Sequence, residues 1–503
     1  MDLPQAWLDM SLRARRIELR RFFARPVRAQ RDYMRLVQAP DHMGVFASIG
    51  TNYHYAVFGR DSIETAEDIL LLRPDIVREV ILVLCQLQGC TTDAITEEEP
   101  GKIHHEHRST QFAGKAIPES SLKILRMLQS MWGKVGADSM TYYGSVDVTP
   151  LFVRLVARYI AQEGAAILDE PYVARDATPK TVSDAVFAAI EWVSGHVALH
   201  PQGLLAYKRA NPKGLLNPVW KDSDTSHLHE DGSLPNYDQP VVSVELQGLA
   251  YDALRAGIDL GLGTFGDRER WHSQATAVQQ HTLHYLWMED RRYFAQGLDV
   301  GPDGQPRQIR TITSDAGALL DSGLLHHLPA EQGRPYIDGI VSTVCGRDML
   351  TKVGVRCRAL KHAQIPGYVD YHGSFAVWPK ESFDIAKGLR RSGYARKADD
   401  LELRIRRGIE RAGDFMELFY VDGRGKVWYE PLSAAAHFES LAPGHHVPVP
   451  EPGQAWTIAA ALSIANGKHT RAHVARERLH KLMVPLRTTR GRLLKRRALQ
   501  REH

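Results

Sequence analysis

A loop near the middle of the chain, residues 217–226, holds an aromatic and an acidic side chain that together could act on a sugar. It reads NPVWKDSDTS and has no hydrophobic period, so we expect it to lie outside helices and strands. The indole of Trp220 offers a flat apolar face to a pyranose, and the carboxyl group of Asp222 can give a proton to a glycosidic oxygen. The same residues also suit an ordinary solvated loop beside a core tryptophan, so other segments must separate the two interpretations.

Four further loop regions combine polar and aromatic residues. Arg60 and Asp61 in the first could form a fork that binds sugar hydroxyls, or a surface pair that caps the next helix. The segment HHEHR at 104–108 lacks the spacing that places two histidines on one helical face, so we expect no metal there. The remaining regions are residues 142–150, which contain Asp147, and a late set at 371–379, 415–423 and 452–456.

Hydrolysis of a glycosidic bond requires two carboxyl groups, one that protonates the leaving oxygen and one that activates water or attacks directly. Asp222 and Glu417 are candidates for these two groups, but 195 residues separate them. Only the fold can bring them together, and the sequence spacing does not show that it does.

The composition of the 503-residue chain is that of an ordinary soluble globular protein, with 44% hydrophobic and 24% charged residues. A net charge of +4 is small for this length and gives no reason to expect a nucleic-acid partner. The basic segment after Leu486 is interpreted as a solvated or frayed helical end. We expect no membrane span, because the most apolar run covers only residues 81–87. The oligomeric state stays open.

The four cysteines, Cys85, Cys90, Cys345 and Cys357, show neither a CxxC pair nor metal-ligand spacing. So few cysteines in so long a chain favour reduced thiols over a disulfide framework. The N-terminal segment is Arg-rich and amphipathic and lacks the uninterrupted apolar stretch of a secretory signal. We therefore expect a cytoplasmic protein.

Helices must position these loops, and the helical spacing of apolar residues predicts them along much of the chain. Thr149 and Pro150 mark the start of one helix as N-cap and first helical residue. The predicted segments are residues 76–87, 151–160, 183–198, 245–260, 271–288, 332–345, 382–393, 395–411 and 454–466. Strand-like alternation is rare. A single large α domain built from helical hairpins, with its loops gathered at one end, is the simplest architecture.

Eight motifs in order make the chain resemble the amylo-α-1,6-glucosidases and glycogen-debranching-like glycoside hydrolases. They are GRDS (59–62), HHEHR (104–108), YYGSVDVTPLF (142–152), WKDS (220–223), VELQGLAYDAL (244–254), YHGSFAVWP (371–379), MELFYVDG (416–423) and PGQAW (452–456). The resemblance covers roughly residues 45–466 and extends to neutral invertases, processing-type glucosidases, and glucosylglycerate and mannosylglycerate hydrolases. It implies an all-α fold, an (α/α)6 toroid of the six-hairpin glycosidase type, over residues 45–485, between an N-terminal helical extension (1–44) and a basic C-terminal tail (486–503).

The resemblance also assigns roles to residues. It makes Asp222 the general acid and Glu417 the general base, with Glu430 in reserve because Met416 stands where relatives usually have proline. Arg60 and Asp61 resemble sugar-binding residues at the floor of the −1 subsite, whose walls would be Trp220, Trp378, Gln454 and Trp456. Further substrate-binding candidates are Glu106, Arg108, Tyr143, Asp147, Lys221, Glu245, Gln247 and His372.

What the resemblance implies is a glycoside hydrolase that cleaves an α-glucoside or a related α-glycoside with inversion, without a metal or an organic cofactor. Inversion places the two carboxyl groups ~6.5–9.5 Å apart, which leaves room for a water molecule. Burial beside Trp220 and nearby carboxylates would keep Asp222 protonated. Many relatives carry a β-sandwich domain before the barrel, where this chain has only its short N-terminal extension. We therefore expect a small glycoside as substrate rather than glycogen.

Three alternatives stay open. A glycoside phosphorylase on the same barrel would replace the base with a phosphate pocket, and a non-catalytic glycan-binding protein would be expected to lose one carboxylate. Both Asp222 and Glu417 are present, which counts against these two. A purely structural helical scaffold should show a repeat of fixed period, and the sequence has none.

Overall fold

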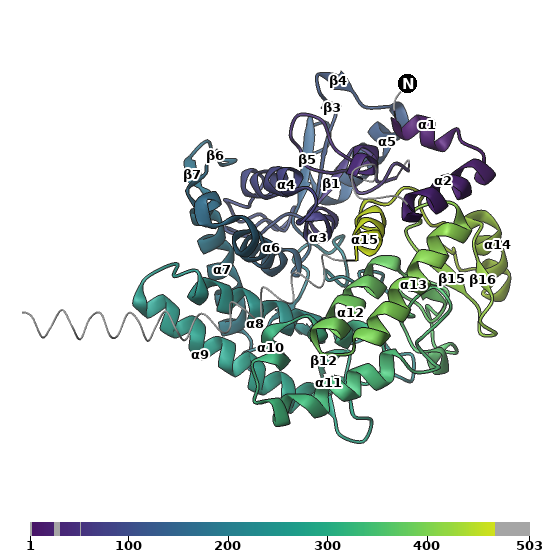
Figure 1. Cartoon of the computed structure of the whole chain (residues 1–503). Helices are drawn as coiled ribbons and strands as arrows, with labels where there is room; N and C mark the ends of the chain where they lie inside the picture. The colour runs from purple at the N-terminus through teal and green to yellow at the C-terminus, as the bar shows by residue number, and fades with distance from the viewer. Residues whose placement is uncertain (1–2, 25–30, 51, 468–503) are drawn as a thin grey trace, which may run out of the picture.

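Helices are the main elements of the protein in the computed structural model, which describes residues 3–24, 31–50 and 52–467 (Figure 1). The α-helices are α1 (Leu3–Leu8), α2 (Leu12–Ala24), α3 (Gly59–Ile69), α4 (Pro74–Gln86), α5 (Glu119–Trp132), α6 (Val148–Glu163), α7 (Val182–Leu199), α8 (Val244–Asp259), α9 (Phe265–His281), α10 (Gly323–His326), α11 (Ala330–Val344), α12 (Pro379–Arg391), α13 (Ala395–Ala412), α14 (Pro431–Leu441) and α15 (Ala455–Ala465). Single turns of other types are the 3-10 helices η2 (Arg31–Leu36), η3 (Ala165–Asp169), η5 (Asp315–Leu320) and η6 (Leu360–His362), and the π-helix η4 (Thr282–Leu286).

The strands are two to four residues long and lie between the helices. They are β1 (Ala56–Phe58), β2 (Glu106–Ser109), β3 (Gln111–Phe112), β4 (Lys115–Ala116), β5 (Ser139–Tyr142), β6 (Pro171–Val173), β7 (Pro179–Thr181), β8 (Ala206–Tyr207), β9 (Val241–Ser243), β10 (Trp287–Met288), β11 (Tyr293–Phe294), β12 (Gly297–Val300), β13 (Pro306–Ile309), β14 (Ala376–Val377), β15 (Phe419–Val421) and β16 (Val427–Trp428). The larger sheets are antiparallel, in the orders β1-β2-β5, β13-β12-β9-β8 and β14-β15-β16.

Six helical elements contact one another in a closed ring (Figure 1). Helix α3 contacts α6, α6 contacts α8, α8 contacts η5, η5 contacts α12, α12 contacts α15, and α15 returns to α3. The sequence of α15, AWTIAAALSIA, is apolar on almost every side, and nine of its residues are buried, from Ala455 to Ser463. A helix that is apolar all round requires neighbours on all sides, and the ring supplies them.

A second set of helices packs against this ring. Helix α4 contacts α3 and α6, α7 contacts α6 and α8, α9 contacts α8, α11 contacts η5, and α13 contacts α12 and α15, while α2 contacts α13 and α15. The amphipathic sequence of α13 explains this placement, because Leu401, Ile405 and Ile409 recur at helical spacing and are buried. Members of the two sets alternate along the chain, so that consecutive helices form hairpins.

Short strands lead directly into three helices of the ring and fix where these helices begin. Strand β1 ends at Phe58, one residue before α3, β9 precedes α8, and β14 precedes α12. Gly59, the first residue of α3, is closely covered, because a Cβ atom there would clash with the carbonyl oxygen of His104. The polar residues that follow in the first turns, such as Asp61 and Glu245, are therefore held in defined positions.

The structure corrects several expectations. Helix α9 begins at Phe265 and not at 271, because Thr264 and Asp267 form a capping box that starts it earlier. It ends at His281, and the π-helix η4 continues the predicted segment to Leu286. Helix α6 begins at Val148 after Asp147, so Thr149 is its second residue and not its N-cap. Helices α5 and α14 and most of the strands were not predicted. The predicted tail, residues 486–503, and the stretch 468–485 lie outside the described residues.

Among the described residues, α7 alone is long and apolar enough to cross a membrane. Half of that segment is buried inside the protein, where α7 packs on α6, α8 and α9. A buried core helix has the same length and composition, so this feature is weak evidence for a span.

Candidate active site

The loop of residues 217–226 is tied to the first turns of the helical ring. Nη2 of Arg60, in α3, donates a hydrogen bond to the carbonyl oxygen of Val219 at 2.9 Å. The backbone N–H of Trp220 donates to Oε1 of Glu245, in α8, at 3.2 Å. Because these partners belong to helices of the ring, the loop that carries Asp222 has a defined position although it lacks regular structure.

Asp222 is the partly exposed carboxyl group of this loop, with 31% of its side chain accessible. Nη1 of Arg60 lies 3.4 Å from Oδ2 of Asp222, while the same guanidinium binds Asp147 through Nε at 2.6 Å and Nη2 at 3.1 Å. Burial and the charge of Asp147 raise the pKa of Asp222 to about 6, and Arg60 opposes this rise. A carboxyl group with such a pKa keeps part of its protons near neutral pH, as a general acid requires.

Three tryptophans from distant segments form an aromatic wall beside this carboxyl group. The ring centroids of Trp220, Trp378 and Trp456 lie 5.2 to 5.7 Å apart, with edge-to-face geometry in every pair. His372 stacks on Trp378 at 5.4 Å, and the ammonium group of Lys380 lies 4.2 Å from the centre of a Trp220 ring. Indole faces of this kind suit the apolar faces of a sugar ring.

Glu417 is buried and is bound to the backbone of a second acidic residue. Its Oε2 accepts a hydrogen bond from the backbone N–H of Glu451 at 3.0 Å, and its own N–H donates to the carbonyl oxygen of Glu451 at 2.9 Å. The Glu451 side chain in turn accepts from the Ser48 hydroxyl at 2.6 Å and from the backbone N–H of Asn52 at 2.9 Å. Glu451 is thus a further buried carboxylate in this region, and the sequence analysis did not select it.

The charges of these carboxyl groups act on one another, which shows that distant segments meet in one site. Burial raises the pKa of Glu417 well above its usual range, and the charges of Glu451, Asp61 and Asp222 add to the rise. Burial and Asp222 also raise the pKa of Asp61 to about 7, against the effects of Arg60 and Lys380. Glu417 and Asp61 therefore take up a proton more readily than an isolated carboxylate does.

Polar groups from the end of the described chain complete the floor of this site. Nε2 of Gln454, at the start of α15, donates a hydrogen bond to Oδ1 of Asp61 at 3.2 Å. The side chains of Asp61 and Gln454 are both buried. The structure thus brings Asp61, Arg60, Gln454 and the three tryptophans together around the two carboxyl groups that the sequence singled out.

Two tyrosines that the sequence analysis did not select also belong to the site. The hydroxyl groups of Tyr53 and Tyr371 lie 3.4 Å apart and join two loops. Burial and the charge of Glu417 raise the pKa of both phenols, and Asp222 adds to the effect at Tyr371. Both residues lie in aromatic stretches of the sequence, but aromatic side chains in loops are also common in cores, so their role had no distinct signal.

Several predicted substrate-binding residues instead contact other parts of the protein. The Gln247 amide bonds to backbone groups of Leu205 and Ser243. The Tyr143 hydroxyl donates to the carbonyl oxygen of Leu87 at 2.7 Å. Glu106 pairs with Arg108, which donates to the carbonyl oxygen of Asn52 at 2.6 Å, and so supports the loop that carries Tyr53. We now interpret these residues, together with the fully buried Lys221, as supports of the site.

The histidine cluster and Glu430 have simpler roles in the structure. Burial lowers the pKa of His104 to about 3 and that of His107 to about 4, so both rings are neutral at ordinary pH. In the described part of the chain, no group of three or more His, Cys, Asp or Glu side chains is arranged to hold a metal ion. Glu430 is exposed and caps α14 by accepting from the backbone N–H groups of Leu432 and Ser433. This placement favours Glu417 over Glu430 as the base.

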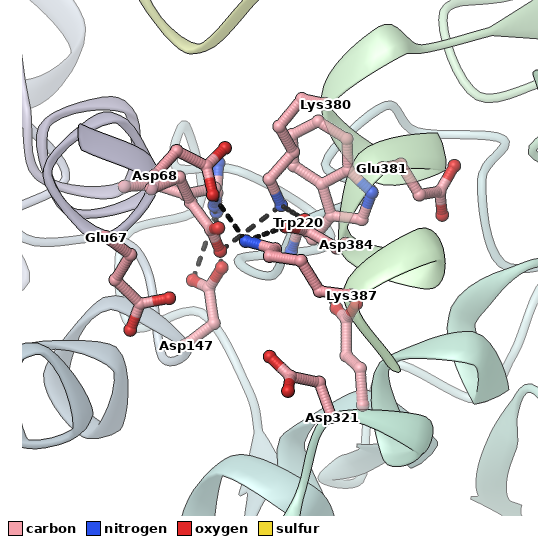
Figure 2. Close-up of polar contacts among 12 residues, drawn as sticks. Glu67, Asp68, Asp147, Trp220, Asp321, Lys380, Glu381, Asp384 and Lys387 are labelled. Carbon is pink, nitrogen blue, oxygen red and sulfur yellow. Dashed lines mark hydrogen bonds and ion pairs between the residues drawn. The ribbon is translucent and has the colours of Figure 1, made fainter. Parts of the chain in front are cut away.

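A network of ion pairs lies next to Trp220 in the interior of the ring (Figure 2). Nζ of Lys380 contacts Asp384 at 2.9 Å and Glu64 at 3.2 Å, and Nζ of Lys387 contacts Asp68 at 2.6 Å. Glu67, Arg154, Arg158 and Asp321 continue the network. A cavity of about 60 Å³ lies among these groups and borders Arg60, Asp147 and Trp220.

No protein-family model matches the chain, and no curated protein sequence matches it. Solved structures do match. The GH63 mannosylglycerate hydrolase from Thermus thermophilus in complex with glucose superposes with a TM-score of 0.54 at 14% identity, covering 88% of this chain and 100% of that one. The same hydrolase in complex with Tris and D-glycerate gives a TM-score of 0.54 at 13% identity, with the same coverage.

A variant of another protein described as a glycosidase, in complex with glucose, superposes with a TM-score of 0.52 at 14% identity. The superposition covers 91% of this chain and 98% of the glycosidase chain. Similarity at this low identity shows a shared fold. Because one fold can carry many activities, the function has to be argued from the site itself.

Proposed function

We propose that this chain, which shares the fold of the GH63 glycosidases, hydrolyses an α-glycoside by general acid/base catalysis. The observation that carries the proposal is that the segments of Asp222 and Glu417, far apart in the sequence, meet at the start of α15. Trp220, in the loop of Asp222, packs on Trp456, while Gln454 and Thr457 donate hydrogen bonds to the carbonyl oxygens of Phe415 and Met416, next to Glu417. The closed ring of helices with a second set packed against it supports an (α/α)6 barrel as the architecture.

In the proposed mechanism, Asp222 gives its proton to the glycosidic oxygen while the bond from that oxygen to the anomeric carbon breaks. Only the form of the enzyme in which Glu417 is ionised reacts, and its carboxylate takes a proton from a water molecule whose oxygen attacks the anomeric carbon from the opposite face. The products are the free sugar with inverted configuration and the alcohol that carried it. Asp61 and Arg60 would bind sugar hydroxyls, and the indole of Trp220 would cover one face of the ring.

The proposed substrate class is a small α-glucoside or α-mannoside, or the end of an oligosaccharide. The similar structures include a mannosylglycerate hydrolase, which makes glycosides of that type sensible first candidates. A glycoside phosphorylase is less well supported, because Glu417 and Glu451 place two carboxylates where a phosphate would have to bind. A non-catalytic glycan-binding protein would not need the proton affinities that the site confers on Asp222.

A reaction panel followed by proton NMR tests this proposal. The panel contains isomaltose, trehalose, glucosylglycerate, mannosylglycerate and a limit dextrin, with and without phosphate. We expect one α-glycoside to be cleaved, with the β-anomer appearing first, and activity to fall at least ~100-fold in Asp222→Asn and in Glu417→Gln.

The matched control is Glu430→Gln, which removes an exposed carboxylate outside the site and should keep wild-type activity. Loss of activity in this control, or full activity in Glu417→Gln, would contradict the assignment of the base. A sugar 1-phosphate formed only with phosphate would identify a phosphorylase. Absence of any cleavage, with sugar binding retained, would favour a glycan-binding protein.

The thiols fit the cytoplasmic location that we propose. All four cysteines, Cys85, Cys90, Cys345 and Cys357, are free in the structure. Free thiols persist in a reducing compartment, where disulfides are rare.

A further inference from the structure

We infer that Lys221 is a positioning residue, whose buried ammonium group holds the loop of the general acid against two elements of the helical ring. The inference rests on the proposed function, because it assigns Lys221 a task through its neighbour Asp222. The Lys221 side chain is completely buried, whereas the Asp222 side chain is partly exposed. The consecutive side chains of Lys221 and Asp222 thus lie in different surroundings, the first in the interior and the second partly at the surface.

Three acceptors surround the ammonium group of Lys221. Nζ donates to Oγ of Ser314 at 2.9 Å, to Oδ1 of Asp315 at 2.8 Å and to Oε1 of Glu381. Three acceptors satisfy the three N–H donors of a lysine side chain. Ser314 and Asp315 stand at the start of η5, and Glu381 lies in the first turn of α12. One side chain therefore fastens the loop to two neighbouring elements of the ring.

The same acceptors are connected to the far end of the loop. Nε2 of Gln296 donates to Oδ2 of Asp315 at 3.1 Å and to the carbonyl oxygen of Ser226 at 2.9 Å. The Ser226 hydroxyl donates to the carbonyl oxygen of Lys221. Residues 221 and 226 are thus attached to one group of partners, and Asp222 lies in the short segment between them.

The charge of Lys221 is what makes this attachment strong. Burial alone would lower its pKa, but Asp315 and Glu381 raise it well above the usual range, so the side chain stays an ammonium ion. Hydrogen bonds between charged groups in a buried site are stronger than neutral ones. A methionine at this position has a similar length but donates no hydrogen bond, so it would leave the loop without its anchor.

Hydrogen exchange tests the positioning role without any substrate. The amides of residues 217–226 are compared, by mass spectrometry, in the wild type, in Lys221→Met and in Lys387→Met. Lys387, in α12, is the matched control, because it is also a largely buried lysine between two carboxylates, Asp68 and Asp384, and these partners lie outside the loop. We expect exchange in the loop to become at least about tenfold faster in Lys221→Met only. Unchanged protection in Lys221→Met would overturn the inference.

Kinetics on the glycoside that the wild type cleaves test the consequence for catalysis. We expect kcat to fall by about 100-fold in Lys221→Met with KM changed less than about threefold, because misplacing the acid by about 1 Å costs that much. An unchanged kcat, with Asp222→Asn inactive, would overturn the inference. If amide exchange in the loop becomes faster in Lys221→Met but the wild type cleaves no glycoside, the proposed function is wrong, whereas the inference that Lys221 holds the loop is supported.

Two further variants separate positioning from stability. Lys221→Met combined with Glu381→Gln removes one of the carboxylates left unpaired, so we expect its Tm to recover towards the wild type while kcat stays low. Recovery of kcat together with Tm would overturn the inference.

If Lys221→Met does not fold, Ser314→Ala replaces it, since it removes one acceptor and keeps the ammonium group. In Ser314→Ala we expect amide exchange in the loop to become about threefold faster and kcat to fall about threefold. Unchanged values would count against the inference.

Discussion

Glu417 and Glu451 show how one acidic residue can change the pKa of another. Two hydrogen bonds join these residues: the Glu417 N–H donates to the Glu451 carbonyl oxygen, and the Glu451 N–H donates to the Glu417 carboxylate. Burial raises the pKa of Glu417, the hydrogen bond from the Glu451 N–H lowers it, and the charge of the Glu451 side chain raises it. A general base must be ionised to act, so in the proposed mechanism this charge limits activity at low pH.

Replacing Glu451 with glutamine should therefore extend activity to lower pH. Removing its negative charge lowers the pKa of Glu417, so the acidic limb of the kcat/KM profile shifts to lower pH. The alkaline limb, which reports loss of the proton that the acid must keep, should move less, because burial and Asp147 are what raise the pKa of Asp222. The measurement is a pH profile of kcat/KM, with Glu430→Gln as control. A shift of the acidic limb to higher pH, or an equal shift in the control, would contradict this electrostatic role.

Motifs in the sequence predicted which residues lie near one another better than they predicted what each side chain contacts. Asp222, Glu417, Asp61 and the tryptophans do come together. Lys221 and Gln247 belong to the same motifs, but their side chains turn towards buried acceptors. The direction of a side chain depends on the surrounding elements, and a linear pattern does not contain that information.

Helix α9 shows the same limit at the scale of a single element. Apolar spacing placed its start at residue 271, but the structure begins it at Phe265 through a capping box. The Thr264 side chain accepts from the N–H of Asp267, and the Asp267 carboxylate accepts from the N–H of Thr264 at 2.9 Å. The first turn has one apolar residue, Phe265, which is exposed, so it adds little to a hydrophobic period.

The capping box should contribute measurably to stability. We expect Thr264→Ala to lower the free energy of unfolding by about 0.5–2 kcal/mol, since Asp267 N–H loses its acceptor. Thr276→Ala, at an exposed position on the same helix, is the control and should change stability by less than about 0.5 kcal/mol. Urea unfolding of both variants provides the measurement. Equal stability of the two variants would show that the cap contributes nothing, and kcat should be unaffected in both.

The elements that were not predicted differ in cause. Helix α5 has Leu125, Leu128 and Trp132 buried at helical spacing, so its pattern was present in the sequence, although Met127 on the other side is also apolar and is 56% exposed. Helix α14 contains an alanine run that is compatible with either face. Strands of two to four residues are too short to show alternation.

At the scale of the whole molecule, the interior ion pairs give the protein two opposite dependences on pH. Burial raises the pKa of Asp68 to about 7, although Lys387 opposes it. At Glu67, burial acts in the same direction, but Arg154, Arg158 and Lys387 outweigh it and hold the pKa below its usual value. The two kinds of carboxyl group lie in one network (Figure 2).

The two kinds of carboxyl group should therefore contribute to the free energy of unfolding with opposite dependence on pH. As pH falls from about 8 through 7 to about 4, the folded state binds protons at Asp61 and Asp68 before the unfolded chain does, so their contribution rises. Below about 4 the unfolded chain binds protons first at positions such as Glu67, and that contribution falls. Buried histidines such as His104 act against Asp68 between about pH 6.5 and 4, because the unfolded chain binds their protons first. The contribution of Asp68 is therefore measured as a difference, by urea unfolding of the wild type and of Asp68→Asn between about pH 3 and 8. We expect the stability of the wild type relative to Asp68→Asn to rise as pH falls from about 7 to 4, and a constant difference would contradict the prediction.

The closure of the ring is the part of the fold that no local pattern predicts. Individual hairpins follow from periodicity, and the alternation of helices with polar loops predicted one α domain. The contact of α3 with α15, in contrast, joins residues 59–69 to residues 455–465. Such a contact depends on the summed geometry of all the hairpins between them.

This contact between the first and last helices of the ring has a consequence for folding during translation. Gln454 and Trp456, at the start of α15, complete the floor and the aromatic wall of the site. A nascent chain on the ribosome therefore lacks these residues of the candidate site until almost all of the described sequence has been translated. The candidate site is completed last, when α15 packs between α3 and α12.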